Sequence, residues 1–290
     1  MLTTADIIKK VRELEIKSKR LASDLFSGEY HSAFKGKGMS FREVREYYPG
    51  DDIRFIDWNV SARFGHPYSK VFEEERELTI MLMVDVSPSV FFGTGEQWKN
   101  QWIAELCAVI GFSALQNNDK VGLILFSDKV EMYIPPKKGR QHLLRIIREL
   151  LYFEPAGKKT DINIPLAYVS NVIKKKCIAF IMSDFISGNF ETTLRIAARR
   201  HDVVGIHVHD PAESMLPDAG IIRMQDAESG KMRLVDTSDP VVRHSFALAY
   251  ADRLLDFKDQ FKRNQSDVIT LTTDQSYIQE LHRFFKQRAN

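Results

Sequence analysis

The sequence predicts an α/β protein whose sheet is mainly parallel and flanked by helices. Short apolar runs rich in β-branched residues recur along the chain, and residues 78–85 are the clearest example. Strands this apolar are buried on both faces, as in parallel sheets. Segments with helical periodicity lie between these runs. The alternation of strand and helix therefore favours a parallel α/β sheet.

The first 77 residues have a different composition. Residues 5–26 place Ile, Val and Leu at helical spacing among Lys, Arg and Glu, which predicts an amphipathic helix. From residue 28 to 77, glycine, aromatic residues and dense mixed charge dominate. We interpret this segment as salt-bridged and packed onto the sheet by Ile56 and Trp58, because runs of mixed charge are usually solvated faces. A docking surface for a partner is the alternative.

We expect the α/β domain to extend from residue 78 to 290, after a helix over 1–27 and the charged segment over 28–77. Two short apolar stretches around a Glu-Ser-Gly turn predict an inserted hairpin near 220–236. In chain order, the predicted elements are strand 78–85, helix 97–116, strands 121–127 and 130–134, helices 143–151 and 162–175, strand 177–183, helix 190–200, strand 201–209, helix 241–264, strand 268–271 and helix 277–288.

Composition excludes several classes of protein. The net charge of +2, from 41 basic and 39 acidic residues, argues against general nucleic-acid binding. Cys107 and Cys177 have neither the spacing of a metal knuckle nor that of a redox pair, and suit reduced core thiols. The N-terminus lacks the apolar core of a signal peptide, and no apolar run approaches the roughly 18–20 residues that cross a bilayer. We expect a cytoplasmic protein without a membrane segment.

Polar side chains follow the strand over 78–85, at its carboxyl end. Asp85, Ser87 and Ser89 lie at alternate positions in a turn. Open α/β sheets hold their ligands at this edge. Hydroxyl and carboxylate oxygens placed together suit Mg²⁺ or Mn²⁺ rather than zinc. Taken alone, the pattern favours ordinary capping of the next helix.

Two later segments favour a metal site instead. Thr160 and Asp161 follow a Gly-Lys-Lys turn, and Ser183 and Asp184 end a second apolar strand. They add a hydroxyl and a carboxylate, again at loops that follow secondary elements. The arrangement resembles the metal-ion-dependent adhesion site of von Willebrand factor A-type domains.

This resemblance implies a ligand set of five side chains. Three would coordinate through hydroxyls and two through carboxylates, directly or by way of water. The implied metal ligands are Asp85, Ser87, Ser89, Thr160 and Asp184. Since only two of them are charged, we expect Mg²⁺ or Mn²⁺ to bind with modest affinity and variable occupancy.

A wider resemblance covers nearly the whole chain. Its motifs are Gly28-Glu-Tyr, Gly36-Lys-Gly, Phe41-Arg-Glu-Val-Arg-Glu-Tyr47, Pro49-Gly-Asp-Asp, Ile56-Asp-Trp58, Ser61-Ala-Arg63, Phe72-Glu-Glu-Glu75, Phe126-Ser-Asp, Arg199-Arg-His-Asp-Val-Val204 and Val235-Asp-Thr-Ser-Asp-Pro240. With the serine motif added, the sequence resembles the bacterial domain-of-unknown-function family fifty-eight, whose members pair an upstream segment of this kind with a von Willebrand factor A-like domain. Pro88 and the pair Val90-Phe91 depart from the usual pattern but remove no metal ligand.

The resemblance implies association with MoxR-type AAA+ ATPases in chaperone-like or assembly roles. We therefore expect a divalent-metal-dependent protein-binding module whose partner is such an ATPase or its client. A hard cation with few anionic ligands gains most from an incoming anionic oxygen. A Glu or Asp of the partner is thus expected to complete the metal coordination.

Catalysis is not expected, because the sequence has no phosphate-binding loop, dinucleotide turn, nucleophile elbow or zinc-protease helix. The main alternative is a Mg²⁺-dependent hydrolase or phosphatase of the haloacid dehalogenase type. Such enzymes carry an acid/base Asp two positions after the nucleophilic Asp, where this chain has Ser87, a much weaker acid. A structural adaptor with an unfilled metal site is a third reading. His207 and His209 lack a third ligand at suitable spacing, which favours structural roles.

Overall fold

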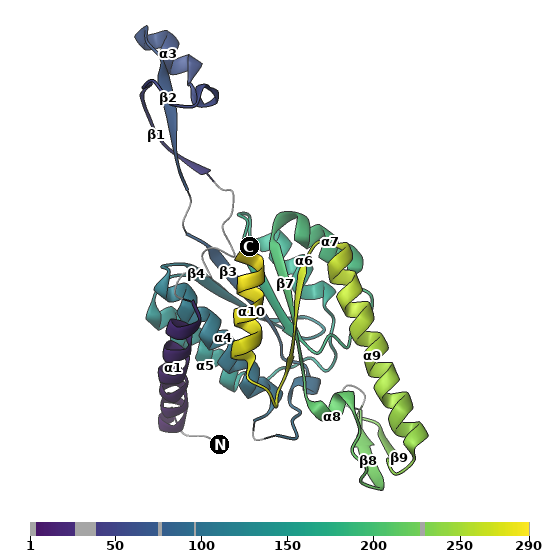
Figure 1. The fold of residues 1–290 in the computed structure, drawn as a ribbon. Helices are drawn as coiled ribbons and strands as arrows, with labels where there is room; N and C mark the ends of the chain where they lie inside the picture. The colour runs from purple at the N-terminus through teal and green to yellow at the C-terminus, as the bar shows by residue number, and fades with distance from the viewer. Residues whose placement is uncertain (1–3, 27–38, 75–76, 96, 227–229, 290) are drawn as a thin grey trace.

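A six-stranded central sheet positions the candidate site. The computed structural model describes residues 4–26, 39–74, 77–95, 97–226 and 230–289 (Figure 1). The strand order is β10-β7-β6-β3-β4-β5, with β5 antiparallel at one edge and the other pairs parallel. The predicted α/β class with a mainly parallel sheet flanked by helices is confirmed. The strands are β3 (Thr79–Asp85), β4 (Lys120–Phe126), β5 (Val130–Lys137), β6 (Ile178–Ser183), β7 (Asp202–His209) and β10 (Asp267–Thr272).

Alternate residues of β3 enter two different cores. Ile80, Leu82 and Val84 face one cluster of buried side chains, whereas Met81 and Met83 face the other. Each large apolar side chain buried in this way contributes about 1.5–3 kcal/mol to folding. The first core is covered by α1 (Thr4–Phe26), α4 (Lys99–Gln116), α5 (Arg140–Tyr152) and α10 (Tyr277–Ala289), and the second by α6 (Asn163–Val172), α7 (Glu191–Arg200) and α9 (Pro240–Arg263).

Helix α4 is buried on nearly all sides, since it lies between the sheet and the helices α1 and α5. It begins at Lys99, a few residues after the serine motif. The chain therefore passes from the carboxyl end of β3 through a short 3-10 helix, η2 (Pro88–Val90), into the most buried helix of the molecule's described part. This connection fixes the serine loop between two core elements.

The edge strand β5 is longer than predicted. The sequence prediction ended it before Pro135 and Pro136, but the strand runs through both prolines to Lys137. Proline lacks a backbone N–H, so a strand tolerates it where no ladder hydrogen bond is required, at an edge or an irregularity. Both conditions hold here, because β5 pairs with β4 alone and the register shifts between Val121 and Leu123.

Residues 39–74 form an arm that projects from the body of the molecule (Figure 1). Strands β1 (Met39–Glu46) and β2 (Tyr68–Glu74) pair antiparallel, and η1 (Ile53–Phe55) and α3 (Trp58–Phe64) lie between them. The predicted packing of Trp58 onto the sheet is wrong, since this side chain is 72% exposed. Ile56 instead bridges to Ser69 inside the arm. Hydrogen bonds within the arm join its elements, such as those from the Tyr68 N–H to Ser61 Oγ and from the Asp57 N–H to the Tyr68 carbonyl.

The remainder of the predicted charged segment, residues 28–38 and 75–76, lies outside the described residues. The predicted division of the chain at residues 27 and 77 stays a prediction. At the place of the predicted insertion, β8 (Ile221–Gln225) and β9 (Met232–Asp236) form an antiparallel hairpin. A one-turn helix, α8 (Pro211–Ser214), precedes it and was not predicted. None of the helices in the described part of the chain is both long and apolar enough to span a membrane.

Candidate metal centre

The five predicted ligands come together at the carboxyl end of the sheet. Asp85 ends β3 and Asp184 follows β6, and these strands are parallel neighbours. The Thr160 hydroxyl donates to Ser87 Oγ at 2.8 Å, and Ser87 Oγ lies 3.0 Å from Ser89 Oγ. Ser89 in turn hydrogen-bonds the Asp184 carboxylate. One continuous network of hydrogen bonds thus joins the three hydroxyls to this carboxylate.

The serine loop is held back against its own strand. The Ser87 N–H donates to Asp85 Oδ1 at 2.8 Å, and the Val90 N–H donates to the Ser87 carbonyl at 3.1 Å. Pro88 is the first residue of η2, where its fixed φ suits a helical turn. The capping that the motif could have provided alone is not observed, because the residue at the start of η2 is Ser87 and its side chain makes no capping hydrogen bond, while Asp85 accepts only the N–H of Ser87 itself. The serine hydroxyls remain directed at one another.

The loop that carries Thr160 is anchored to the end of β4. The Asp161 N–H donates to the Ser127 carbonyl at 3.1 Å, and the Gly157 N–H donates to Glu131 Oε1 at 2.6 Å. A Cβ at Gly157 would lie 2.0 Å from Ser127 Oγ, so the close approach requires glycine. The Gly-Lys-Lys turn of the sequence thus places Thr160 through this contact.

Asp85 is a completely buried carboxylate, 0% exposed. Its Oδ2 accepts the Ser183 hydroxyl at 2.6 Å. Burial, followed by the charge of Asp184, raises the pKa of Asp85 to about 7, although hydrogen bonds from Ser183 and Ser87 oppose the change. A positive charge in the site would restore the ionised form. Ser183 was not predicted as part of the site, although its place directly before Asp184 at a strand end was visible.

Asp184 has the opposite behaviour because a cation contacts it. Its Oδ1 accepts the Ile186 N–H at 3.2 Å, and its Oδ2 accepts Lys99 Nζ at 3.2 Å. Burial acts to raise the pKa of Asp184, but the Lys99 ammonium and hydrogen bonds from Ser89 and Ile186 outweigh it, so this pKa is lowered. The two carboxylates at the end of the sheet are thus unequal: Asp184 is ionised and Asp85 holds its proton near neutrality.

Lys99 and Glu213 are the functional candidates that the sequence reasoning missed. The Lys99 side chain is 1% exposed, and Nζ donates to Glu213 Oε1 at 2.6 Å as well as to Asp184. Burial acts to lower the pKa of Lys99, but the two carboxylates outweigh it and raise this pKa, so the group is charged. Glu213 belongs to the capping box of α8, where its other oxygen accepts the Asp210 N–H at 2.8 Å.

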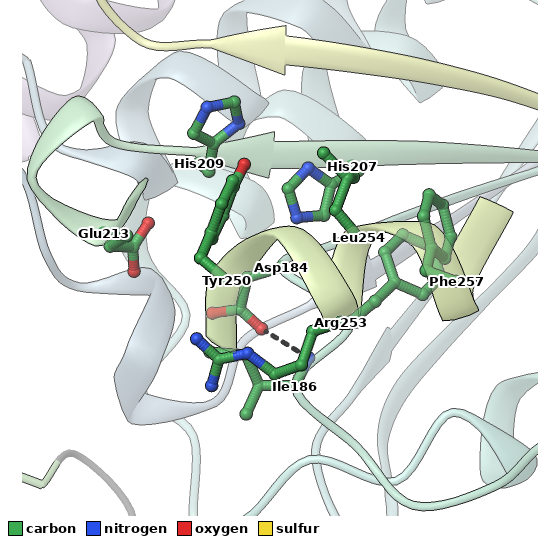
Figure 2. Close-up of a pocket in the computed structure, with 10 residues that line it drawn as sticks. Asp184, Ile186, His207, His209, Glu213, Tyr250, Arg253, Leu254 and Phe257 are labelled. Atoms are coloured by element: carbon green, nitrogen blue, oxygen red, sulfur yellow. Dashed lines mark hydrogen bonds between the residues drawn. The ribbon is translucent and has the colours of Figure 1, made fainter. Parts of the chain in front are cut away.

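A small cavity of about 30 Å³ lies beside Asp184 and Glu213, between the ends of β6 and β7 and helix α9. Figure 2 shows the rings of His207, His209 and Tyr250 near one another in the lining of this cavity, and the rings are tilted relative to one another. Burial is the main cause that lowers the pKa of His207, to about 3, so its ring is neutral. Within the described residues, no group of three or more His, Cys, Asp and Glu side chains is arranged to hold a metal ion. The histidine pair therefore has no metal geometry in this part of the chain.

The five-residue set nevertheless fits a hard cation by its chemistry. It offers three hydroxyls and two carboxylates, all oxygen donors of the kind that Mg²⁺ and Mn²⁺ prefer. The buried Asp85 carboxyl has hydrogen-bond donors around it and no positively charged side chain among its main partners. A divalent ion would supply that charge.

Comparisons with known proteins place the chain in a family. Protein Rv1480 of Mycobacterium tuberculosis is 32% identical over 281 residues, 96% of this chain and 88% of the relative. BatB from Bacteroides thetaiotaomicron is 14% identical with a TM-score of 0.46, covering 73% of this chain and 98% of that one. The SpRpn10 VWA domain is 10% identical with a TM-score of 0.40, covering 73% of this chain and 95% of that one. A family model described as "Protein of unknown function DUF58" matches residues 43–254, and the chain belongs to this family.

Proposed function

We propose that this protein is an interaction module whose contact with its partner depends on Mg²⁺ or Mn²⁺ bound by Asp85, Ser87, Ser89, Thr160 and Asp184. The observation that carries the proposal is the convergence of these five side chains, from three separate loops, on one hydrogen-bonded network.

The donor set indicates what the partner supplies. Three hydroxyls are neutral ligands, and the Asp184 charge is already shared with Lys99. A divalent ion in this site would retain most of its positive charge, so an anionic oxygen would bind it most favourably. A Glu or Asp side chain of the partner is that oxygen. The resemblance described above makes a MoxR-type AAA+ ATPase, or its client, the first partner to test.

The module is proposed to be non-catalytic. Among the described residues, the hydrogen-bonding partners of the Ser87 hydroxyl are the side chains of Ser89, Thr160 and Asp85, and none of them is a histidine. Ser87 therefore lacks the histidine base that activates the serine of a Ser-His pair. Phosphatase, phosphodiesterase and nucleotidase substrates assayed with Mg²⁺ or Mn²⁺ should show no turnover. Turnover that Asp85→Asn abolishes would instead establish the hydrolase alternative.

The proposal is tested by capture of a MoxR-type AAA+ ATPase by this protein, with and without chelator. Thr160→Ala removes one hydroxyl ligand from a loop and should reduce capture at least about tenfold, as chelation does, because each lost ligand weakens a site with few charges. Thr79→Ala is the matched control, since Thr79 is the first residue of β3 and lies at the opposite end of that strand from Asp85. Capture that is unchanged by both Thr160→Ala and chelation would mean that the partner docks elsewhere, with the arm as the next candidate.

A further inference from the structure

Lys99 is a charged side chain enclosed in the core at the edge of the candidate metal centre. It is among the largest fully buried side chains of the described chain. Its ammonium reaches two carboxylates from distant segments, Asp184 at 3.2 Å and Glu213 at 2.6 Å. Since Lys99 is the first residue of α4, these bonds tie that helix to the end of β6 and to α8.

The ammonium uses a carboxylate that a metal would also use. One oxygen of Asp184 accepts a backbone N–H and the other accepts Lys99 Nζ. A divalent ion that takes Asp184 as a ligand must share this carboxylate with a fixed positive charge. Two like charges a few ångströms apart repel by several kcal/mol at the polarity of a protein site. The Lys99 ammonium, which is part of the chain, would thus compete with a metal ion for the Asp184 carboxylate.

Glu213 holds the Lys99 ammonium in position. Its bond to Lys99 is the shorter of the two, and its position is fixed by the capping box with Asp210. A lysine ammonium is a compact charge on a flexible stem, so it can move toward one partner when the other is taken. Glu213 therefore offers Lys99 a second carboxylate when Asp184 turns to a metal.

We propose that Lys99 is a tethered cation that holds Asp184 in place when no metal is bound and that sets the low affinity of the site for divalent ions. This inference rests on the proposed function, because it concerns the same five ligands. It makes metal binding an exchange, in which the ammonium gives up its share of Asp184 to the incoming ion and keeps its bond to Glu213.

The test is a titration of the full-length protein with Mn²⁺ alone, followed by calorimetry and by the electron paramagnetic resonance signal of free Mn²⁺. The double variant K99M/E213Q removes the ammonium and its anchor together, so net charge is unchanged and no unpaired Glu213 carboxylate is left. We expect its dissociation constant for Mn²⁺ to fall at least about tenfold, because the positive charge that is lost contacts the ligand Asp184, whereas the Glu213 carboxylate that is lost contacts Lys99 and the Asp210 N–H. Lys99→Gln, which keeps hydrogen-bonding capacity, should show the same direction and serves if the double variant does not fold.

The matched control is K17M/E105Q. Lys17 and Glu105 form another Lys–Glu ion pair of α4, at 2.8 Å between Nζ and Oε2, but this pair joins α1 to α4, its lysine is exposed, and neither residue contacts a proposed metal ligand. This control should bind Mn²⁺ as the parent does. Circular dichroism and the thermal transition establish that each variant is folded.

The outcomes separate this inference from the proposed function. Tighter Mn²⁺ binding in the Lys99 variants supports it, whether or not the parent binds measurably. If only the variants bind, Lys99 suppresses the site and the metal dependence proposed for the native protein is wrong. If parent and variants bind with equal affinity, the tethered-cation role is overturned and the proposed function stands. If neither binds at millimolar Mn²⁺, both are overturned.

Discussion

The candidate metal centre and the arm use charged residues in opposite ways. In the metal centre, the ion pairs are buried and join segments far apart in the chain, as Lys99 does with Asp184 and Glu213. In the arm, they join residues of the arm to one another and are more exposed to solvent, as between Arg54 and Asp52, two residues apart. Removing one partner of a buried pair leaves an uncompensated charge, whereas exposed pairs contribute little to stability. We therefore expect the charges of the metal centre to matter more for the stability of the fold than those of the arm.

The apolar residues show the same contrast. Trp102 in α4 is buried against Tyr277, whereas Trp58 in the arm is exposed. Other large apolar side chains of the arm are exposed as well, so the arm has surface that a partner could cover. The exposed apolar residues of the arm are Tyr48, Ile53, Trp58 and Phe64. The candidate metal centre and the exposed apolar residues of the arm are thus two candidate contact surfaces for a partner.

The largest expected loss of stability follows from breaking the buried ion pairs of Lys99. Lys99→Ala should lower the free energy of unfolding by about 3–5 kcal/mol, because it leaves Asp184 and Glu213 buried near each other without a cation. Arg54→Ala removes the exposed pair of the arm and should leave the urea midpoint unchanged. Equal urea midpoints for Lys99→Ala and Arg54→Ala would show that the ion pairs of the metal centre contribute no more to stability than those of the arm.

The second prediction concerns pH. The pKa of Asp85 is about 7 in the folded protein, against an ordinary value of 3.8, so the folded state holds the proton more tightly than the unfolded chain. The stabilisation that the protonated Asp85 side chain contributes is complete below about pH 4 and is lost as the pH rises toward 7. This contribution to the free energy of unfolding is at most about 4 kcal/mol. Asp85→Asn mimics the protonated acid and should remove this loss.

Urea unfolding of the parent and of Asp85→Asn between pH 4 and 7 measures the effect as a difference. The difference is needed because His207, whose pKa burial lowers to about 3, stabilises the fold with the opposite sign as the pH rises. Asp52→Asn is the arm's counterpart. The hydrogen bond from Arg54 lowers the pKa of Asp52 to about 2, so its contribution is lost only as the pH falls below 4. A parent and Asp85→Asn with parallel pH profiles would contradict the assignment.

The sequence predicted the part of the metal centre that depends on strand ends. Asp85 and Asp184 each end an apolar run, and parallel strands bring their carboxyl ends to the same edge of the sheet. The serines follow Asp85 within four positions, so their proximity is local. Thr160 could be added only through the resemblance, because its placement depends on the contact between Gly157 and Ser127.

Lys99 and Glu213 could not be paired from the sequence. They are 114 positions apart in the chain, and Glu213 belongs to α8. This helix has four residues, which is too short for a helical periodicity to be recognised in the sequence. A lysine at the start of an apolar helix was visible, but the pattern alone gave it no partner. The packing of Trp58 was mispredicted for a related reason. Hydrophobicity predicts burial, but only tertiary structure shows whether a surface is there to receive the side chain.

The smallest expected effect on stability belongs to the arm, and it is the sharpest test of the comparison. Trp58→Ala should change the free energy of unfolding by no more than about 0.5 kcal/mol, because the side chain is already in solvent. Trp102→Ala, the matched control in the core, should cost about 3–5 kcal/mol. The stability of Trp58→Ala makes it a clean probe of binding. If the partner docks at the metal centre alone, this variant captures it as well as the parent does, while Thr160→Ala does not. Loss of capture with Trp58→Ala and not with Thr160→Ala would assign recognition to the exposed arm and leave the metal centre as a structural element of the sheet edge.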